Sequence, residues 1–273
     1  MRLIFDFDGT ITQQDTISDL AAAAVAFQHT QRGQHLQATW DQVVRHYMSD
    51  YHQYKENYEP KEEERREVAQ EVEFLNGLRP IEQASLQRVQ ASGVFDGLEH
   101  MGLFEMGVSA VESKKIETRE GFKAVTKMAQ DNGWPLGVIS VNWSRSFIRG
   151  VLHQFSMPIV ANEIASDGRV EGPEFLGEQL TNSAGKLSAL KHEFGGDDES
   201  ILYFGDSSTD LECLLAHKGI VIADDDTDSS LIRTLQRLSI PVPHVEAYDK
   251  AANASVHWAR NFQEVIASGL LDR

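Results

Sequence analysis

Two pairs of acidic residues and one lysine have the types and the spacing of a catalytic centre. Asp6 and Asp8 flank a single phenylalanine, and Asp206 and Asp210 lie four positions apart just after an apolar run. In the first pair one carboxylate can attack a substrate while the other is turned aside where the strand ends. Carboxylate oxygens also bind hard divalent cations, and Lys186 supplies a positive charge for an anionic group.

The chemistry-bearing residues follow short apolar runs that are typical of buried strands. Such runs occupy residues 2–5, 135–140, 159–161, 201–204 and 220–222. Asp6, Ser140 and Asp206 each fall at the end of one of them. Because ligands of parallel sheets bind at the carboxyl ends of the strands, we expect these three side chains to lie close together.

Helical and extended segments alternate from about residue 118 onward. This alternation predicts an α/β fold, a doubly wound parallel sheet with helices on both faces. Residues 15–111 differ, because their long segments have helical spacing and their β-like runs are weak. We therefore expect a catalytic α/β core formed by residues 1–14 and 112–273, with residues 15–111 inserted as a mostly helical domain.

Three further helices are expected. A helix over residues 36–47 would present several large side chains on one face: Trp40, Val43, Val44 and Tyr47. Pro60 suits the start of a helix over 61–75, whose first acids favour its N-terminal dipole. An amphipathic helix is also expected over 257–262, docked on the core.

Four motifs, taken in order, resemble those of the haloacid dehalogenase superfamily. They are Asp-Phe-Asp-Gly-Thr at residues 6–10, Ser140, Lys186, and Gly-Asp-Ser-Ser-Thr-Asp at 205–210. Their spacing is similar to that of the capped phosphatase branch, close to phosphoserine phosphatase-like enzymes. The resemblance covers the core and implies a Rossmann-like fold, with the helical insert as a cap domain over the site.

The resemblance implies a role for each motif residue. Asp6 would be the nucleophile and a metal ligand, Asp8 the acid and base whose backbone carbonyl also binds metal, and Lys186 the cation on the phosphate. Asp206 and Asp210 would complete the metal site, Asp210 either as a ligand or by orienting other groups. The implied cofactor is Mg²⁺, and the implied function is hydrolysis of a small phosphomonoester through an aspartyl-phosphate on Asp6.

The second motif departs from that of the phosphoserine enzymes. Ser140 is expected to bind a phosphoryl oxygen, but Val141 and Asn142 follow it in place of two glycines. Backbone amides remain for phosphate binding, although the change argues against phosphoserine as the substrate. Asn142 could donate its amide to the substrate or cap the helix that contains Phe147.

Other polar residues of the insert are open to two interpretations. The resemblance implies that Asp15 contacts an amine or hydroxyl of the substrate. It could equally cap the helix that starts at Thr16. Arg65 or Arg66 could bind a second anion of the substrate, whereas a solvated helix face is the simpler interpretation of their charge run.

Composition limits the partners. The formal charge of −17 argues against nucleic acid and against an anionic membrane surface, but it leaves small anions open, since a bound cation reverses the local field. No apolar stretch is long enough to span a bilayer, and Cys213 is the single cysteine. We expect a cytoplasmic protein whose partner is a small phosphorylated metabolite.

Two alternative functions use the same fold. A phosphomutase or phosphotransferase would keep the nucleophile Asp6, and Asp8 does not argue against it. A catalytically inactive regulatory binding protein would not need competent residues at all four motifs, and this chain has them. The sequence specifies neither the ester nor the oligomeric state.

Overall fold

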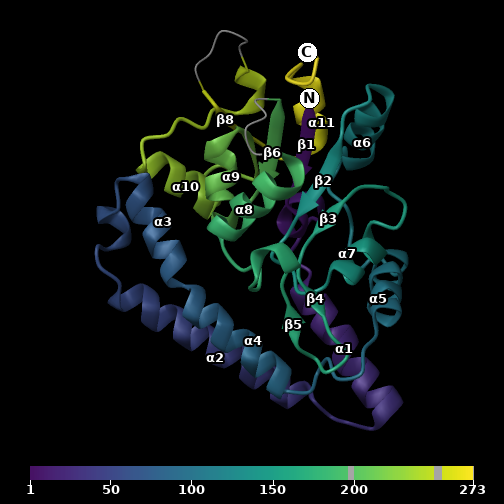
Figure 1. Ribbon diagram of the computed structural model, residues 1–273. Helices are drawn as coiled ribbons and strands as arrows, with labels where there is room; N and C mark the ends of the chain where they lie inside the picture. Colours follow the sequence, from purple (N-terminus) through teal and green to yellow (C-terminus); the bar gives the residue numbers. More distant parts are fainter. Residues whose placement is uncertain (196–199, 249–253, 273) are drawn as a thin grey trace.

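A six-stranded parallel sheet lies at the centre of the computed structural model, which describes residues 1–195, 200–248 and 254–272 (Figure 1). Its strands are β1 (Arg2–Phe5), β2 (Leu136–Ile139), β3 (Ile159–Val160), β6 (Ile201–Gly205), β7 (Lys218–Ile222) and β8 (Val256–Ala259). They lie in the order β3-β2-β1-β6-β7-β8. Because β1 pairs with both β2 and β6, the strand ends that precede Asp6, Ser140 and Asp206 are direct neighbours.

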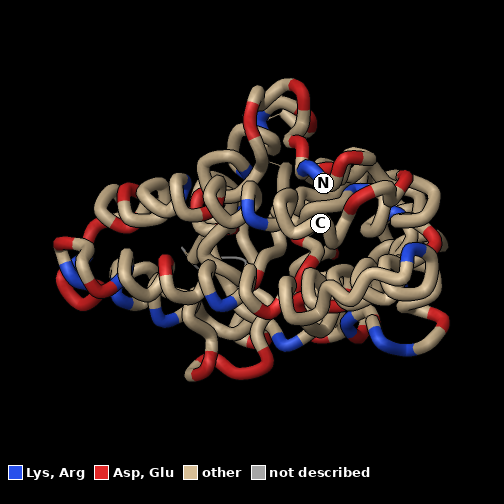
Figure 2. Tube along the Cα trace, turned by 90° about the horizontal axis from the view of Figure 1, so that it is seen from below, with Lys and Arg blue, Asp and Glu red and all other residues tan. Residues whose placement is uncertain are grey.

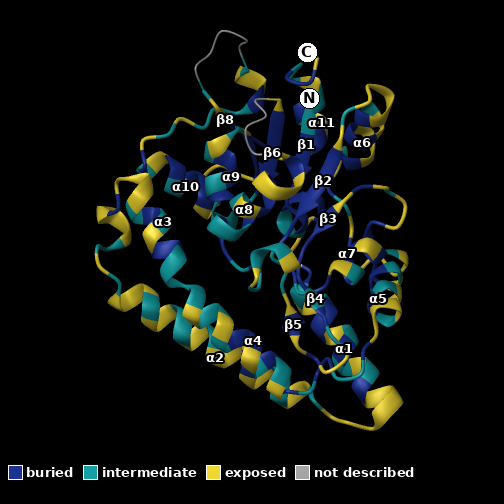
Figure 3. Cartoon of the chain, in the orientation of Figure 1, coloured by how far each residue is buried: buried dark blue, intermediate teal, exposed yellow. Residues whose placement is uncertain are grey.

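Both faces of the sheet are buried, as the near-continuous apolar strands require. On one face Phe5 stacks on Phe204, with ring centroids 4.8 Å apart, and Phe122 and Phe262 contact Phe5 edge-on. On the other face Tyr203 belongs to a second core cluster. Figure 3 shows the strands as the most deeply buried part of the molecule.

Helices cover each face. One core cluster joins the sheet to α6 (Phe122–Asp131), α7 (Arg145–Val151) and α11 (Phe262–Ala267), and the other joins it to α8 (Ser183–Phe194), α9 (Leu211–Ala216) and α10 (Ser230–Arg237). The predicted doubly wound α/β fold is therefore confirmed. A short antiparallel pair, β4 (Glu163–Ile164) with β5 (Val170–Glu171), was not expected. Short helical turns complete the structure: Phe7–Ile11, Glu62–Glu64, Glu174–Leu176, Ser208–Asp210 and Val245–Ala247.

Between β1 and α6 the chain is mostly helical, as expected for the insert. The helices are α1 (Ile17–Arg32), α2 (Gln37–Asn57), α3 (Val68–Gly77), α4 (Arg79–Ala91) and α5 (His100–Glu112). In Figure 1, α2 and α4 lie side by side below the carboxyl ends of the strands. A hydrogen bond from Tyr47 to Glu82 and an ion pair from Arg88 to Asp50 join these two helices.

The last helix of the insert rests on the core. A Cβ added to Gly107 of α5 would lie 2.3 Å from the backbone oxygen of Phe147, and one added to Gly150 of α7 would lie 2.0 Å from that of Phe104. The two glycines thus allow α5 and α7 to approach closely. The division of the chain at residues 15 and 111 stays a prediction.

The expected helix over residues 257–262 is wrong in its first part. Residues Val256–Ala259 form β8, in parallel register with β7, where Trp258 lies opposite Val221. Helix α11 begins only at Phe262 and is capped by Asn261. A four-residue apolar segment fits either structure, and pairing with a neighbouring strand decides between them.

The expected helix over residues 61–75 is interrupted. A single helical turn ends at Glu64, and α3 begins at Val68. The break allows the Arg65 side chain, 2% exposed, to turn inward. There its Nε donates to Glu71 Oε2 at 2.7 Å, and its guanidinium lies over the Phe74 ring. The chain thus forms this buried ion pair in place of one continuous helix.

Charge is spread over the molecule. In Figure 2, Asp and Glu occur throughout the trace, with Lys and Arg between them. None of the helices in the described part of the chain has the length and apolarity needed to cross a bilayer.

Candidate active site

The turn after β1 brings the first motif against the fourth. Asp6 follows β1 directly, and the chain then passes through Gly9 at φ +69°. A Cβ on Gly9 would lie 2.4 Å from Asp206 Oδ2, so a glycine lets the turn approach this acid. Thr10 donates its hydroxyl to Asp206 Oδ1 at 2.8 Å and holds the acid in place.

Lys186 links the first and the fourth motif. It lies in the first turn of α8, which begins at Ser183 rather than at Lys186 and is capped by Asn182. Its Nζ is 2.8 Å from Asp6 Oδ2 and 2.7 Å from Asp210 Oδ1, and the side chain is fully buried. Burial opposes the charged form, but Asp210 and Asp6 outweigh it and raise the pKa of Lys186 above its usual value. The lysine is therefore a fixed cation at the strand ends.

Asp210 is fully engaged by protein donors. Its Oδ1 accepts from Lys186 and from the Tyr203 hydroxyl, each at 2.7 Å. Its Oδ2 accepts from the backbone N–H groups of Asp206 at 3.2 Å and Ser207 at 3.1 Å. These bonds fix the turn after β6 and favour an orienting role for Asp210 over a direct metal contact.

Three acids gather where a cation could bind. Asp6, Asp206 and Asp210 each offer one carboxylate oxygen within 4.8 Å of the others. Burial and the charge of Asp210 raise the pKa of Asp206 to about 7, and the same causes raise the pKa of Asp6 well above its usual range. Lys186 alone does not balance three carboxylates. The donor set is all oxygen and carries excess negative charge, so it fits a hard divalent cation such as Mg²⁺.

The Asp8 carboxylate is held by three donors. Its Oδ1 accepts from the backbone N–H of Thr16 at 2.8 Å and from the Thr16 hydroxyl at 2.6 Å. Its Oδ2 accepts from Asn142 Nδ2 at 2.9 Å. Burial, followed by the charge of Asp15, raises the pKa of Asp8 to about 6. A carboxyl with this pKa can give or take a proton near neutral pH.

The residues after β2 lie beside the acids. Ser140 is fully buried, and its Oγ accepts from the backbone N–H of Asn142 at 3.0 Å. The expectation that Asn142 caps the following helix is wrong. Ser144 caps α7 by accepting from Phe147 N, whereas Asn142 Oδ1 accepts from the Ser144 N–H at 3.1 Å. The Asn142 Nδ2 group donates to Asp8 and, at 3.3 Å, to the Thr16 hydroxyl. Asn142 thus positions an acid and does not have its amide free for a substrate.

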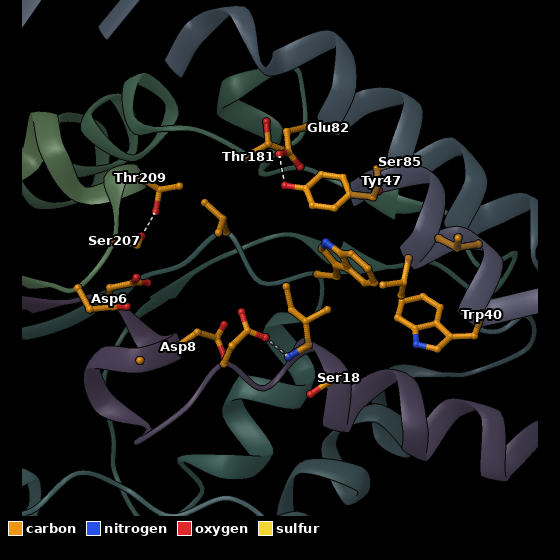
Figure 4. Close-up of a pocket in the computed structure, with 18 residues that line it drawn as sticks. Asp6, Asp8, Ser18, Trp40, Tyr47, Glu82, Ser85, Thr181, Ser207 and Thr209 are labelled. Carbon is orange, nitrogen blue, oxygen red and sulfur yellow. Dashed lines mark hydrogen bonds between the residues drawn. The ribbon is translucent and has the colours of Figure 1, made fainter. Parts of the chain in front are cut away.

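A cavity of about 510 Å³ opens from the acids towards the helical insert (Figure 4). In that view Asp6 and Asp8 lie on one side and Trp40 on the opposite side, with Tyr47 and Glu82 between them along the upper wall. Val141 and Asp15 also line the cavity. Asp15 is exposed and accepts from the Ile17 N–H at 2.9 Å, so it supports the start of α1 and faces the cavity as well.

Three polar residues of the site were missed in the sequence. Thr10 and Thr16 hold Asp206 and Asp8, and the Tyr203 hydroxyl holds Asp210. Thr10 is part of the first motif and could have been found there. Tyr203 lies within an apolar strand, and its position there indicates a buried ring and gives no sign of the role of its hydroxyl. Arg65 and Arg66 do not line the cavity.

Similar sequences point to one family. The sequence profile of the haloacid dehalogenase-like hydrolases matches residues 3–215. Cold tolerance protein 1 of Saccharomyces cerevisiae is 24% identical, over 90% of this chain and 87% of that protein. A CTO1 family protein of Schizosaccharomyces pombe is 27% identical, over 78% of each chain.

Solved structures share the fold. A substrate-bound phosphoserine phosphatase aligns with a TM-score of 0.54 at 15% identity and covers 97% of this chain and 96% of its own. Cytosolic 5'-nucleotidase IIIB bound to cytidine aligns with a TM-score of 0.52 at 15% identity, over 87% of this chain and 77% of that one. Because the sequence identities are only 15%, these alignments show a shared fold and nothing beyond it.

Proposed function

The chain belongs to the haloacid dehalogenase-like hydrolase family, and from this premise we propose that it is a magnesium-dependent phosphohydrolase. Its substrate would be a small phosphomonoester metabolite, cleaved through an aspartyl-phosphate on Asp6. The observation that carries the proposal is the position of Lys186, whose ammonium lies 2.8 Å from Asp6 and 2.7 Å from Asp210. Asp6 lines the cavity, and the buried ammonium beside it would offset negative charge when this nucleophile meets an anionic phosphate.

The first half-reaction forms the covalent intermediate. A carboxylate oxygen of Asp6 attacks phosphorus, and the bond from phosphorus to the ester oxygen breaks. Asp8 gives its proton to that oxygen, and the alcohol leaves. Lys186 offsets the negative charge on Asp6 and on the phosphoryl group. Asp6, Asp206 and the Asp8 backbone carbonyl would hold Mg²⁺, while Asp210 would orient Lys186 and the turn after β6. The bound ion would neutralise phosphoryl oxygens.

The second half-reaction restores the enzyme. Asp8, now a carboxylate, takes a proton from water, whose oxygen attacks the phosphorus of the aspartyl-phosphate. The bond to Asp6 breaks, and inorganic phosphate and the Asp6 carboxylate are formed. Thr16 and Asn142 keep Asp8 in place through both steps.

Phosphate binding falls to the residues after β2. The Ser140 hydroxyl oxygen already accepts a hydrogen bond from Asn142 N, so its own proton is available for a phosphoryl oxygen. Val141 lines the cavity next to it. We assign Asn142 to positioning Asp8, in place of a direct substrate contact.

We also propose that residues 15–111 act as a cap domain. The cavity joins acids of the core to side chains of α2 and α4, so these helices would contact the part of the substrate beyond the phosphate. A cap that closes over the phosphate also excludes water from the intermediate and from competing acceptors.

The direct test is Asp6→Asn, with Asp131→Asn, an exposed acid on α6, as the matched control. The amide has nearly the same shape as the carboxylate but is a poor nucleophile. Phosphate release from p-nitrophenyl phosphate in Mg²⁺ should disappear in Asp6→Asn and persist in the control, with circular dichroism unchanged in both. Near wild-type release by folded Asp6→Asn would overturn the covalent mechanism.

A further inference from the structure

The cavity beyond the acids is walled by aromatic side chains. Trp40 and Tyr47 come from α2, and Trp143 comes from the loop after β2. The rings of Trp40 and Trp143 lie edge to face, with centroids 5.9 Å apart. In Figure 4 Trp40 closes the side of the cavity opposite Asp6. A flat ring attached to the phosphate would meet π-faces and edges on this side.

The charged side chains that line the described cavity are all acidic. Among its described lining residues, Lys, Arg and His are absent, and Asp15 and Glu82 add to the acids of the site. Arg65 is committed to Glu71, and Arg66 Nε donates to the Glu63 backbone oxygen. The leaving group would therefore find no cation for a second phosphate or a carboxylate.

Glu82 is an acid of the cavity wall without a cation beside it among the described lining residues. Its Oε1 accepts from the Tyr47 hydroxyl at 2.8 Å, and within the described chain it forms no ion pair. Burial raises the pKa of Glu82 above its usual value, which is the effect of a carboxylate withdrawn from water without a cation beside it. A positive group in the cavity would relieve this cost.

We propose that the substrate is the phosphomonoester of a flat aromatic or heteroaromatic alcohol that carries a positive charge and no second anionic group. This inference rests on the proposed phosphohydrolase function. The ring would pack against Trp40 and Trp143, while Glu82 and Asp15 offset its charge. A cation next to tryptophan and tyrosine faces gains further attraction from the ring quadrupoles.

Four synthetic esters separate the contributions. They are (1-methylpyridinium-3-yl)methyl phosphate, benzyl phosphate, cyclohexylmethyl phosphate and 3-carboxybenzyl phosphate, which are similar in size but differ in charge and aromaticity. In Mg²⁺ the wild-type kcat/KM should fall in that order. The cationic ester should exceed benzyl phosphate by about tenfold, the scale of a cation–π contact.

Variants assign the preference to residues. Glu82→Gln removes the carboxylate that faces the cation, so it should lower the kcat/KM ratio of the pyridinium ester to benzyl phosphate by about tenfold. Trp40→Leu should lower the ratio of benzyl phosphate to cyclohexylmethyl phosphate. Glu56→Gln, which removes an exposed carboxylate from α2, should change neither ratio. Differences in leaving-group reactivity cancel, because each ratio is compared between variants.

The outcomes separate this inference from the proposed function. If p-nitrophenyl phosphate is hydrolysed in an Asp6-dependent way but the carboxylate or cyclohexyl ester is preferred, the inference is overturned and the function stands. The same holds if Glu82→Gln and Glu56→Gln give equal ratios. If the folded wild-type enzyme releases phosphate from p-nitrophenyl phosphate but from none of the four esters, only the inference is overturned. If it releases phosphate from none of the five, both are overturned.

Discussion

At the scale of single residues, the site depends on hydrogen bonds that orient acids. Asp8 accepts hydrogen bonds from Thr16 and Asn142. Asp210 accepts hydrogen bonds from Tyr203 and Lys186. These partners support the proposed chemistry, since a carboxylate that rotates freely would spend little time aimed at the ester oxygen.

Thr16 gives the sharpest test of this orientation. Thr16→Val keeps the shape but removes the hydroxyl that donates to Asp8 at 2.6 Å. We expect kcat for phenyl phosphate to fall by about 10- to 100-fold, the worth of a hydrogen bond to a charged group. The loss should be smaller for p-nitrophenyl phosphate, whose leaving group needs less proton donation. Thr16→Ser, which keeps a hydroxyl, should recover most of the rate; equal losses for both esters would make Thr16 merely structural.

The limits of sequence reasoning at this scale follow from distance along the chain. Asp6, Asp8, Lys186 and Asp206 could be predicted because each stands in a recognisable motif at a strand end or helix start. Thr16 could not, because nothing local indicates that Asp8 folds back on it. Asn142 was predicted to cap a helix or to contact the substrate. Its observed partner, Asp8, could not be predicted because it lies far away in the first motif.

At the scale of elements, a buried charge cluster joins the insert to the core. Arg65 Nε and Arg237 Nη2, the latter from α10, both donate to Glu71 Oε2 on α3, at 2.7 Å and 2.9 Å. The same cluster explains why the expected helix over 61–75 breaks, and β8 shows the related case of a strand chosen by its neighbour β7. Local patterns predicted the elements whose apolar spacing fits one structure only, and they failed where the same segment suits two.

Glu71→Ala should destabilise the protein strongly. It would leave two arginines facing each other, one of them 2% exposed, without their shared carboxylate. The expected loss is about 3 kcal/mol of unfolding free energy, measured by urea denaturation. Glu73→Ala, an exposed acid on the same helix, should change stability by less than about 0.5 kcal/mol. Similar losses in the two variants would mean that the cluster does not dock α3.

At the scale of the whole molecule, the fold gathers acidic side chains at one edge of the sheet, where a cation could bind. Alternation of strands and helices made the parallel sheet predictable from the sequence, and the sheet brings acids 200 residues apart to within 4.8 Å. The boundary between core and cap was harder to predict, because α5 belongs to the insert in sequence yet packs on α7 of the core.

Magnesium should therefore stabilise the fold as well as support turnover. A ligand at about 100 times its dissociation constant adds about 2.7 kcal/mol when only the folded state binds it. Urea denaturation with MgCl₂, against NaCl at equal ionic strength, should show this increase in the wild type and lose it in Asp206→Asn. An identical response in the variant would remove Asp206 from the metal site. Chelation should abolish hydrolysis, and Ca²⁺, which takes more ligands at longer distances, should inhibit it.

The central claim is the covalent bond between Asp6 and phosphorus, and acid-quenched peptide mass spectrometry tests it most directly. The Asp8→Asn variant is mixed with p-nitrophenyl phosphate and Mg²⁺, quenched in acid within the first turnover, and digested. Because the base for the second half-reaction is gone, the peptide that contains Asp6 should carry one phosphoryl group on that residue, and Asp6→Asn should carry none. A burst of p-nitrophenol from Asp8→Asn with Asp6 unmodified, or with the phosphoryl group on another residue, would contradict the claim.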